Sequence, residues 1–219
     1  MIKNIIFDFD GVIVDSEILA SRAFSKYFNN MGHKFKENDF FQYAGMKTVQ
    51  VIEILSKKYG ITNKKKFTND ILELVADIYS NDLKLVNGVQ KFIMNSNKNH
   101  FIGSNSNKDR ILAGLRFVGF NKFFLSNQVY SFDMVQRPKP DPDIYLKVLE
   151  DNLLNIEETI IIEDSGVGVK AATSAGVKVL GITAGKHWHL NRDKHELFDN
   201  GALNVFSDFE SLGKAIEEF

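Results

Sequence analysis

Short runs of apolar residues, each ending at a polar residue, recur along the chain. They lie at 5–7, 101–103, 160–162 and 179–182, and are followed by Asp8, Ser104, Glu163 and Thr183. Their length and their β-branched and aromatic composition predict buried strands rather than helices. Helical spacing of apolar residues lies between them, at about 88–97, 107–118, 141–151 and 165–175. This alternation predicts an α/β fold with a Rossmann-like doubly wound parallel sheet.

The segment between the first and second predicted strands departs from this alternation. Its apolar residues follow helical faces: first Ala20, Ala23, Phe24, Tyr27, Phe28 and Met31, then Val51, Ile52, Leu55 and Tyr59. A further helical pattern lies around 68–80. We therefore expect an inserted all-helical domain at 16–83 and a core domain made of 1–15 and 84–219.

Composition and charge narrow the class of protein. The 27 Lys and Arg nearly balance the 28 Asp and Glu, so a net charge of -1 supplies no general field for nucleic acid or an anionic membrane. The absence of cysteine excludes disulfides and thiolate chemistry. The first apolar run is too short for a secretory signal, and no stretch approaches the length of a membrane span. We expect a cytoplasmic enzyme that binds neither nucleic acid nor membranes.

Carboxylates gather where the predicted strands end. Asp8 and Asp10 follow the first strand, and Glu163 and Asp164 follow another. The carboxyl ends of parallel strands meet at one edge of a sheet, so these groups should be neighbours. Two like charges about 4 Å apart repel by about 4 kcal/mol at an effective dielectric of 20, so a cation is required. An all-oxygen group suits Mg²⁺, and Lys139, in a segment stiffened by prolines, would add a second positive charge.

The same residues resemble the motifs of the haloacid dehalogenase superfamily. The segment 8–17 is similar to its first motif, Ser104-Asn105-Ser106 to the second, Lys139-Pro140 to the third and 162–165 to the fourth. Their order and spacing match over essentially the whole chain. The helical insertion resembles the cap of the β-phosphoglucomutase-like branch, and the details of the motifs resemble sugar-phosphate phosphatases, 6-phosphogluconate phosphatase among them.

The resemblance implies a magnesium-dependent phosphatase for a small phosphorylated metabolite, a sugar phosphate or sugar-acid phosphate. Asp8 would attack phosphorus and be transiently phosphorylated. Asp10 would protonate the leaving oxygen and later deprotonate the attacking water. The side chains of Asp8 and Asp164 and the backbone carbonyl of Asp10 would hold Mg²⁺, with Glu163 as a further ligand.

The resemblance also implies contacts to the substrate. Ser104 and Lys139 would bind the phosphoryl oxygens. The other expected contacts are Gly11, Asn105 and Ser106 from the core and Lys47 and Thr48 from the cap. For Lys47 and Thr48 an exposed helix start explains the pattern equally well, and both interpretations stay open.

Other functions remain as alternatives. A phosphosugar mutase is the nearest, but the mutases carry a histidine at the cap entrance where this chain has Ala20. A non-catalytic phosphosugar-binding module would not need both a nucleophile and a proton shuttle. A dehalogenase has no need of the Mg²⁺ cluster. We expect a monomer.

Two local patterns receive structural interpretations. The spacing in His187-Trp188-His189 lacks a third nearby metal ligand, and we interpret the segment as a surface loop. Gly166 and Gly168 resemble a dinucleotide-binding fingerprint, but Glu163-Asp164-Ser165 separate them from the strand. We expect these glycines to allow close packing in a turn, and Ser165 to cap the following helix.

Overall fold

The computed structural model describes residues 1–43, 48–188 and 192–219. Within these residues six parallel strands form one sheet in the order β3-β2-β1-β4-β5-β6. They are β1 (Asn4–Phe7), β2 (Asn99–Ser104), β3 (Val129–Ser131), β4 (Thr159–Glu163), β5 (Lys178–Ile182) and β6 (Asn204–Phe206). The predicted parallel α/β fold is confirmed. Strand β1 is internal, with Phe7 aligned to Ile102 on β2 and Ile162 on β4.

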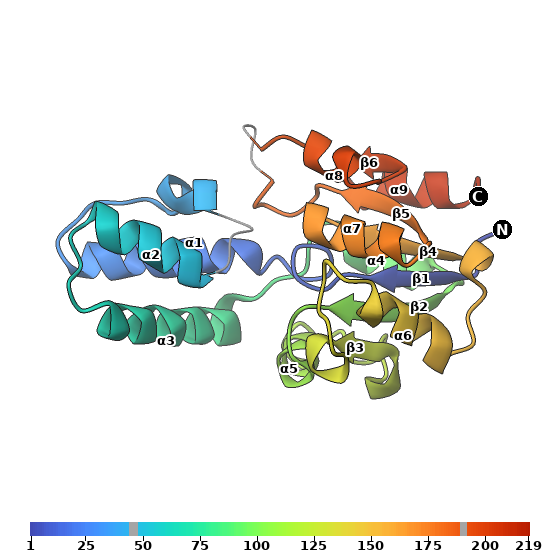
Figure 1. The fold of residues 1–219 in the computed structure, drawn as a ribbon, viewed down its shortest axis with the longest axis horizontal. Coiled ribbons are helices and arrows are strands. Elements are labelled where there is room, and N and C mark those ends of the chain that lie inside the picture. Colours follow the sequence, from blue (N-terminus) through green and yellow to red (C-terminus); the bar gives the residue numbers. More distant parts are fainter. Residues whose placement is uncertain (44–47, 189–191) are drawn as a thin grey trace.

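Helices cover both faces of the sheet (Figure 1). Ile5 and Phe7 pack on one side with α4 (Val89–Asn95), α5 (Lys108–Phe117) and α9 (Phe209–Ile216). Ile6 packs on the other with α6 (Asp143–Asp151), α7 (Gly166–Ser174) and α8 (His195–Asp199). Because both faces are buried, β1 and β4 contain uninterrupted apolar runs, at 5–7 and 160–162, and these runs make the two strands recognisable in the sequence.

Strands β3 and β6 were not expected from the sequence. Each spans three residues at an edge of the sheet, too few for a periodic pattern to distinguish them from loops. Short 3₁₀ helices were not expected either. They lie at Ser126–Gln128, Phe132–Met134 and Ile156–Glu158.

The segment after β1 is helical, as predicted. It contains α1 (Glu17–Asn30), a 3₁₀ helix at Glu37–Tyr43, α2 (Thr48–Lys58) and α3 (Lys64–Asp82). These helices enclose their own apolar cluster, in which the rings of Phe24 and Phe28 stack on Phe40. Met31 does not share their buried face, because α1 ends before it and its side chain is 57% exposed.

The two connections between the helical segment and the sheet lie side by side. The N–H of Asp15 donates to the carbonyl of Lys84, and the N–H of Val86 donates to the carbonyl of Ile13. Figure 1 shows the helices beyond these connections standing apart from the sheet. Since the chain enters them from the end of β1, they lie over the carboxyl edge of the strands. The domain division at 16 and 83 stays a prediction.

Candidate active site

Asp8 lies directly after β1, at the middle of the carboxyl edge of the sheet. Its N–H donates to the Ile162 carbonyl at 2.9 Å, and its carboxyl group is buried. Ser104 ends the neighbouring strand on one side and Glu163 ends the neighbour on the other. The structure therefore brings together residues that are about 95 and 155 positions apart in the sequence, as expected for parallel strands.

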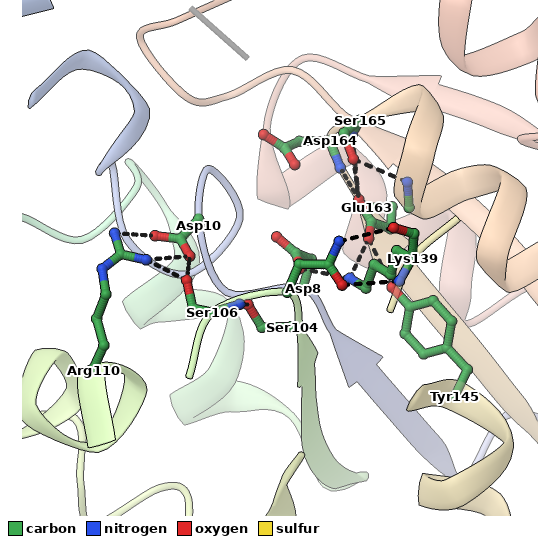
Figure 2. Close-up of polar contacts among 12 residues, drawn as sticks. Asp8, Asp10, Ser104, Ser106, Arg110, Lys139, Tyr145, Glu163, Asp164 and Ser165 are labelled. Carbon is green, nitrogen blue, oxygen red and sulfur yellow. Dashed lines mark hydrogen bonds and ion pairs between the residues drawn. The ribbon is translucent and has the colours of Figure 1, made fainter. Parts of the chain in front are cut away.

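A buried group of ionisable residues, which we call the Lys139 cluster, surrounds Asp8. It consists of Asp8, Lys139, Tyr145, Glu163 and Asp164. The Lys139 ammonium donates to Asp8 Oδ1 and to Glu163 Oε1, both at 2.6 Å. The Tyr145 hydroxyl donates to the same Glu163 oxygen at 2.7 Å (Figure 2). Lys139 is thus aimed at the carboxylate that was assigned the nucleophilic role.

Backbone contacts and an aromatic ring fix Lys139 in place. The side-chain amide of Asn105 donates to the Lys139 carbonyl at 3.0 Å, and its oxygen accepts from the Lys139 N–H at 2.9 Å. The ammonium also lies 4.7 Å from the centre of the Tyr145 ring, a cation–π distance. The Asn105 side chain therefore positions Lys139. A direct substrate contact from the Asn105 backbone stays a prediction.

The Lys139 cluster holds more negative than positive charge. Asp8, Glu163 and Asp164 each offer a carboxylate oxygen, and these atoms lie within 4.8 Å of one another. Burial, with neighbouring carboxylates, raises the pKa of Asp8 and of Asp164 well above the ordinary range, although Lys139 opposes this. Burial lowers the pKa of Lys139, but Asp8 and Glu163 outweigh it and the net shift is upward. A hard cation with oxygen ligands, such as Mg²⁺, would balance these charges.

Glu163 is saturated with hydrogen bonds from the protein. Besides Lys139 and Tyr145 on Oε1, its Oε2 accepts from the N–H groups of Asp164 and Ser165 and from the Ser165 hydroxyl. Ser165 also caps α7 by accepting from the Gly168 N–H, as predicted. Through these hydrogen bonds Glu163 holds both the Lys139 ammonium and the backbone of Asp164 and Ser165 in place.

A second group, which we call the Arg110 cluster, holds Asp10. It consists of Asp10, Ser16, Tyr79, Ser106 and Arg110. The Arg110 guanidinium donates to both carboxylate oxygens of Asp10, at 2.9 and 3.0 Å, and to the Ser106 hydroxyl. The hydroxyls of Ser16 and Ser106 each donate to Asp10 as well. Figure 2 shows the Asp10 carboxylate turned toward Arg110 and away from Asp8.

The charges of the Arg110 cluster are balanced. Burial alone would raise the pKa of Asp10, but Arg110 and the two serine hydroxyls outweigh it and lower this pKa. The guanidinium also lies 4.5 Å from the ring centre of Tyr79 on α3, so it joins the helical segment to the core. The sequence interpretation missed Arg110. Arg110 lies in the first turn of α5, four residues after Ser106, and this short spacing is the local signal for a shared site.

Gly11 is required for packing beneath the carboxylates. Its φ is +86°, and a Cβ there would lie 1.9 Å from Asp164 Oδ2 and 2.9 Å from His187 Cε1. A substrate contact for Gly11 stays a prediction.

The expectation of a surface loop is wrong for His187, which is 1% exposed and has Nε2 only 2.8 Å from Asp164 Oδ2. The chain folds back over the loop of Asp164 here, which sequence spacing alone cannot show.

The remaining expectations have mixed outcomes. Lys47 lies outside the described residues; Thr48 begins α2, but its side chain lies outside the description too. Gly166 and Gly168 were expected in a turn that connects two elements, but they lie in the first turn of helix α7. Close packing is correct for Gly168, since a Cβ there would lie 1.7 Å from Glu163 Oε1.

The fold agrees with comparisons to known proteins. Residues 5–182 match the family model of haloacid dehalogenase-like hydrolases, and the chain belongs to this family. Among curated relatives, it is 29% identical over 216 residues to the phosphorylated carbohydrates phosphatase of Thermotoga maritima, covering 96% of each chain. It is 26% identical over 188 residues to the 6-phosphogluconate phosphatase of Escherichia coli (strain K12), covering 85% of each.

A solved structure supports the same branch of the family. A protein of Thermotoga maritima, described provisionally as a β-phosphoglucomutase, superposes with a TM-score of 0.81 and 27% identity, covering 99% of each chain. This likeness covers 99% of this chain, so it extends over the helical segment as well as the sheet. Among the residues that the structure describes, no helix has the length and apolar character needed to span a membrane.

Proposed function

We propose that this protein is a Mg²⁺-dependent phosphatase that hydrolyses a small phosphorylated metabolite through an aspartyl-phosphate intermediate. The observation that carries the proposal is the Lys139 cluster: a carboxylate at the end of the central strand, paired to a buried ammonium and adjacent to further buried carboxylates. An anionic phosphoryl group can approach such a site only if cations offset its charge.

Asp8 is the proposed nucleophile. One carboxylate oxygen is held by Lys139, so the other is available to attack phosphorus in line with the departing oxygen. The bond from phosphorus to the substrate oxygen breaks as the bond to Asp8 forms. Lys139 and Ser104 would then bind the equatorial phosphoryl oxygens, where negative charge accumulates.

Asp10 is the proposed proton shuttle. It would give a proton to the departing oxygen and later remove one from the water that hydrolyses the aspartyl phosphate. In the present arrangement both its oxygens are engaged by Arg110, Ser16 and Ser106. Asp10 must therefore leave this arrangement, at least in part, to reach the substrate.

The donor set suits Mg²⁺, with Asp8 and Asp164 as its side-chain ligands and the Asp10 carbonyl as a third. Mg²⁺ would supply charge neutralisation on the phosphoryl oxygens. Glu163 already accepts hydrogen bonds on both oxygens. We therefore assign it to holding Lys139 and the loop of Asp164 rather than to direct ligation.

The substrate class is inferred from the relatives. Two curated relatives are named for phosphorylated carbohydrates and for 6-phosphogluconate, and a helical cap over the carboxyl edge is suited to enclosing a small molecule. A phosphosugar mutase is the second candidate, supported by the likeness to the β-phosphoglucomutase-like structure. Ala20 packs beside the apolar cluster of the helical segment and supplies no proton-transferring group there.

The test is phosphate release from a panel of sugar phosphates, sugar-acid phosphates, phosphoglycolate and nucleotides, with Mg²⁺ and with EDTA. We expect release that requires Mg²⁺ and disappears in Asp8→Asn, with Asp10→Asn binding substrate but not turning it over. Interconversion of phosphosugars without net phosphate release would instead identify a mutase. Folded protein that binds phosphosugars yet transforms none would identify a binding module.

A further inference from the structure

The buried side chain of His187 packs in a confined space beside Asp164. Two glycines make room for its ring: a Cβ on Gly11 would lie 2.9 Å from His187 Cε1, and a Cβ on Gly185 would lie 2.7 Å from both Cε1 and Nδ1. Any larger residue at either position would displace the imidazole. The ring is thus enclosed by backbone from the first-strand loop and from the loop after β5.

The ring nitrogens of His187 are not satisfied by the protein residues that the structure describes. Neither nitrogen makes a hydrogen bond of good angle with those residues. Nε2 nevertheless lies 2.8 Å from Asp164 Oδ2, which is hydrogen-bond distance. Burying an imidazole beside a carboxylate without using its N–H is unfavourable, and an aliphatic side chain would fill the space without that cost.

We propose that His187 is a positioning residue for Asp164, the proposed metal ligand: with Mg²⁺ bound, Nε2 would donate to Oδ2 and so keep the other carboxylate oxygen directed to the metal. The inference rests on the metal site of the proposed function. Carboxylates that bind metals are commonly oriented by a second hydrogen-bonding group, whose loss weakens metal binding about 10–100-fold.

The direct test is Mg²⁺ affinity, measured by titration calorimetry on the full chain without substrate. We expect His187→Leu to bind Mg²⁺ about 10–100-fold more weakly than the unsubstituted protein. His187→Gln, whose amide nitrogen can take the place of Nε2, should recover most of the affinity. His187→Asn, whose shorter amide falls nearer the position of Nδ1, should not. His195→Gln, on an exposed residue at the start of α8, is the matched control and should bind normally.

Thermal unfolding in EDTA separates positioning from packing. If His187 acts through Asp164, the Gln and Asn variants should unfold at similar temperatures without metal, yet differ in the rise that Mg²⁺ produces. Equal Mg²⁺ affinity in the Leu, Asn and Gln variants would overturn the inference alone and leave His187 a packing residue. Failure of the unsubstituted protein to bind Mg²⁺ would overturn the inference together with the proposed metal site. If the Leu variant does not fold, the comparison of Gln with Asn still decides.

Discussion

The Lys139 cluster and the Arg110 cluster meet at the same edge of the sheet, yet they differ in burial and in balance of charge. The first sets one ammonium against three buried carboxylates, and the pKa values of Asp8 and Asp164 are raised. The second pairs one guanidinium with one carboxylate, and the pKa of Asp10 is lowered. The first has an excess of carboxylates that a further cation would offset, whereas the charges of the second are balanced.

This difference suggests that the two clusters have different roles. Asp8 and Glu163 are positioned by the ends of β1 and β4, where the proposed Mg²⁺ and phosphoryl group would bind. Asp10 accepts hydrogen bonds from Ser16, just before α1, and from Arg110 on α5. The Arg110 guanidinium in turn lies over the ring of Tyr79 on α3. The position of Asp10 should therefore depend on how the helical segment sits over the site.

The largest effect is expected at Lys139. Lys139→Met leaves Asp8 and Glu163 buried without their counter-ion, which should destabilise the fold by about 3–5 kcal/mol. It should also lower kcat by about 10²–10³-fold, since a phosphoryl-binding charge is lost. Denaturant unfolding and steady-state kinetics measure the two effects. The control is Lys147→Met, which removes a half-exposed pair with Asp151 on α6 and should cost less than about 1 kcal/mol.

The next effect concerns metal and pH. Mg²⁺ at 100 times its Kd should stabilise the protein by about 2.7 kcal/mol, and Asp164→Asn should lose most of this. Because the folded-state pKa values of Asp8 and Asp164 lie above their unfolded values, the folded state binds more protons. In EDTA, acidification from neutral pH through these raised pKa values should therefore contribute stability, while in Mg²⁺ the benefit of the metal should shrink. Thermal melts at several pH values measure this. The expectation would be contradicted if the melting temperature changed with pH in the same way in EDTA and in Mg²⁺.

A smaller effect is expected at Arg110. Arg110→Gln removes the main charge that lowers the Asp10 pKa, so that pKa should rise. The acidic limb of the kcat profile, where Asp10 must be ionised to activate water, should move to higher pH. Stability should change by about 1 kcal/mol or less, because the Arg110 side chain is 37% exposed. Arg116→Gln, on the same helix but exposed, should leave the profile unmoved.

The smallest effect is expected at Tyr79. Tyr79→Leu removes the ring beneath Arg110 and should cost about 0.5–1 kcal/mol from the cation–π contact. Tyr79→Phe keeps the ring and loses only a long hydrogen bond of 3.4 Å to the Arg110 carbonyl, so it should be close to neutral. Equal destabilisation by both variants would show that the hydroxyl, which fits against Gly114, matters more than the stack.

The central strands and the carboxylates after them could be predicted from the sequence because both are local features. The part of a strand that is buried on both faces is usually apolar, so the runs at 5–7 and 160–162 could be recognised as strands. The polar residues that follow these runs indicated the carboxyl edge of the sheet. Edge strands of three residues and 3₁₀ turns carry no such pattern. The inserted helices were evident from their apolar periodicity, whereas Met31 was misplaced because α1 ends one residue earlier.

The sequence was sufficient to predict the parallel sheet, the helical insertion and, through the family resemblance, candidate roles for Asp8, Asp10, Lys139 and Asp164. The tertiary structure was needed to identify the side chains that lie against the carboxylates: Arg110 beside Asp10, Tyr145 beside Glu163 and His187 beside Asp164. The reason is physical. Apolar periodicity reports which face of an element is buried, but a contact between polar side chains on separate loops depends on distances that sequence spacing does not encode.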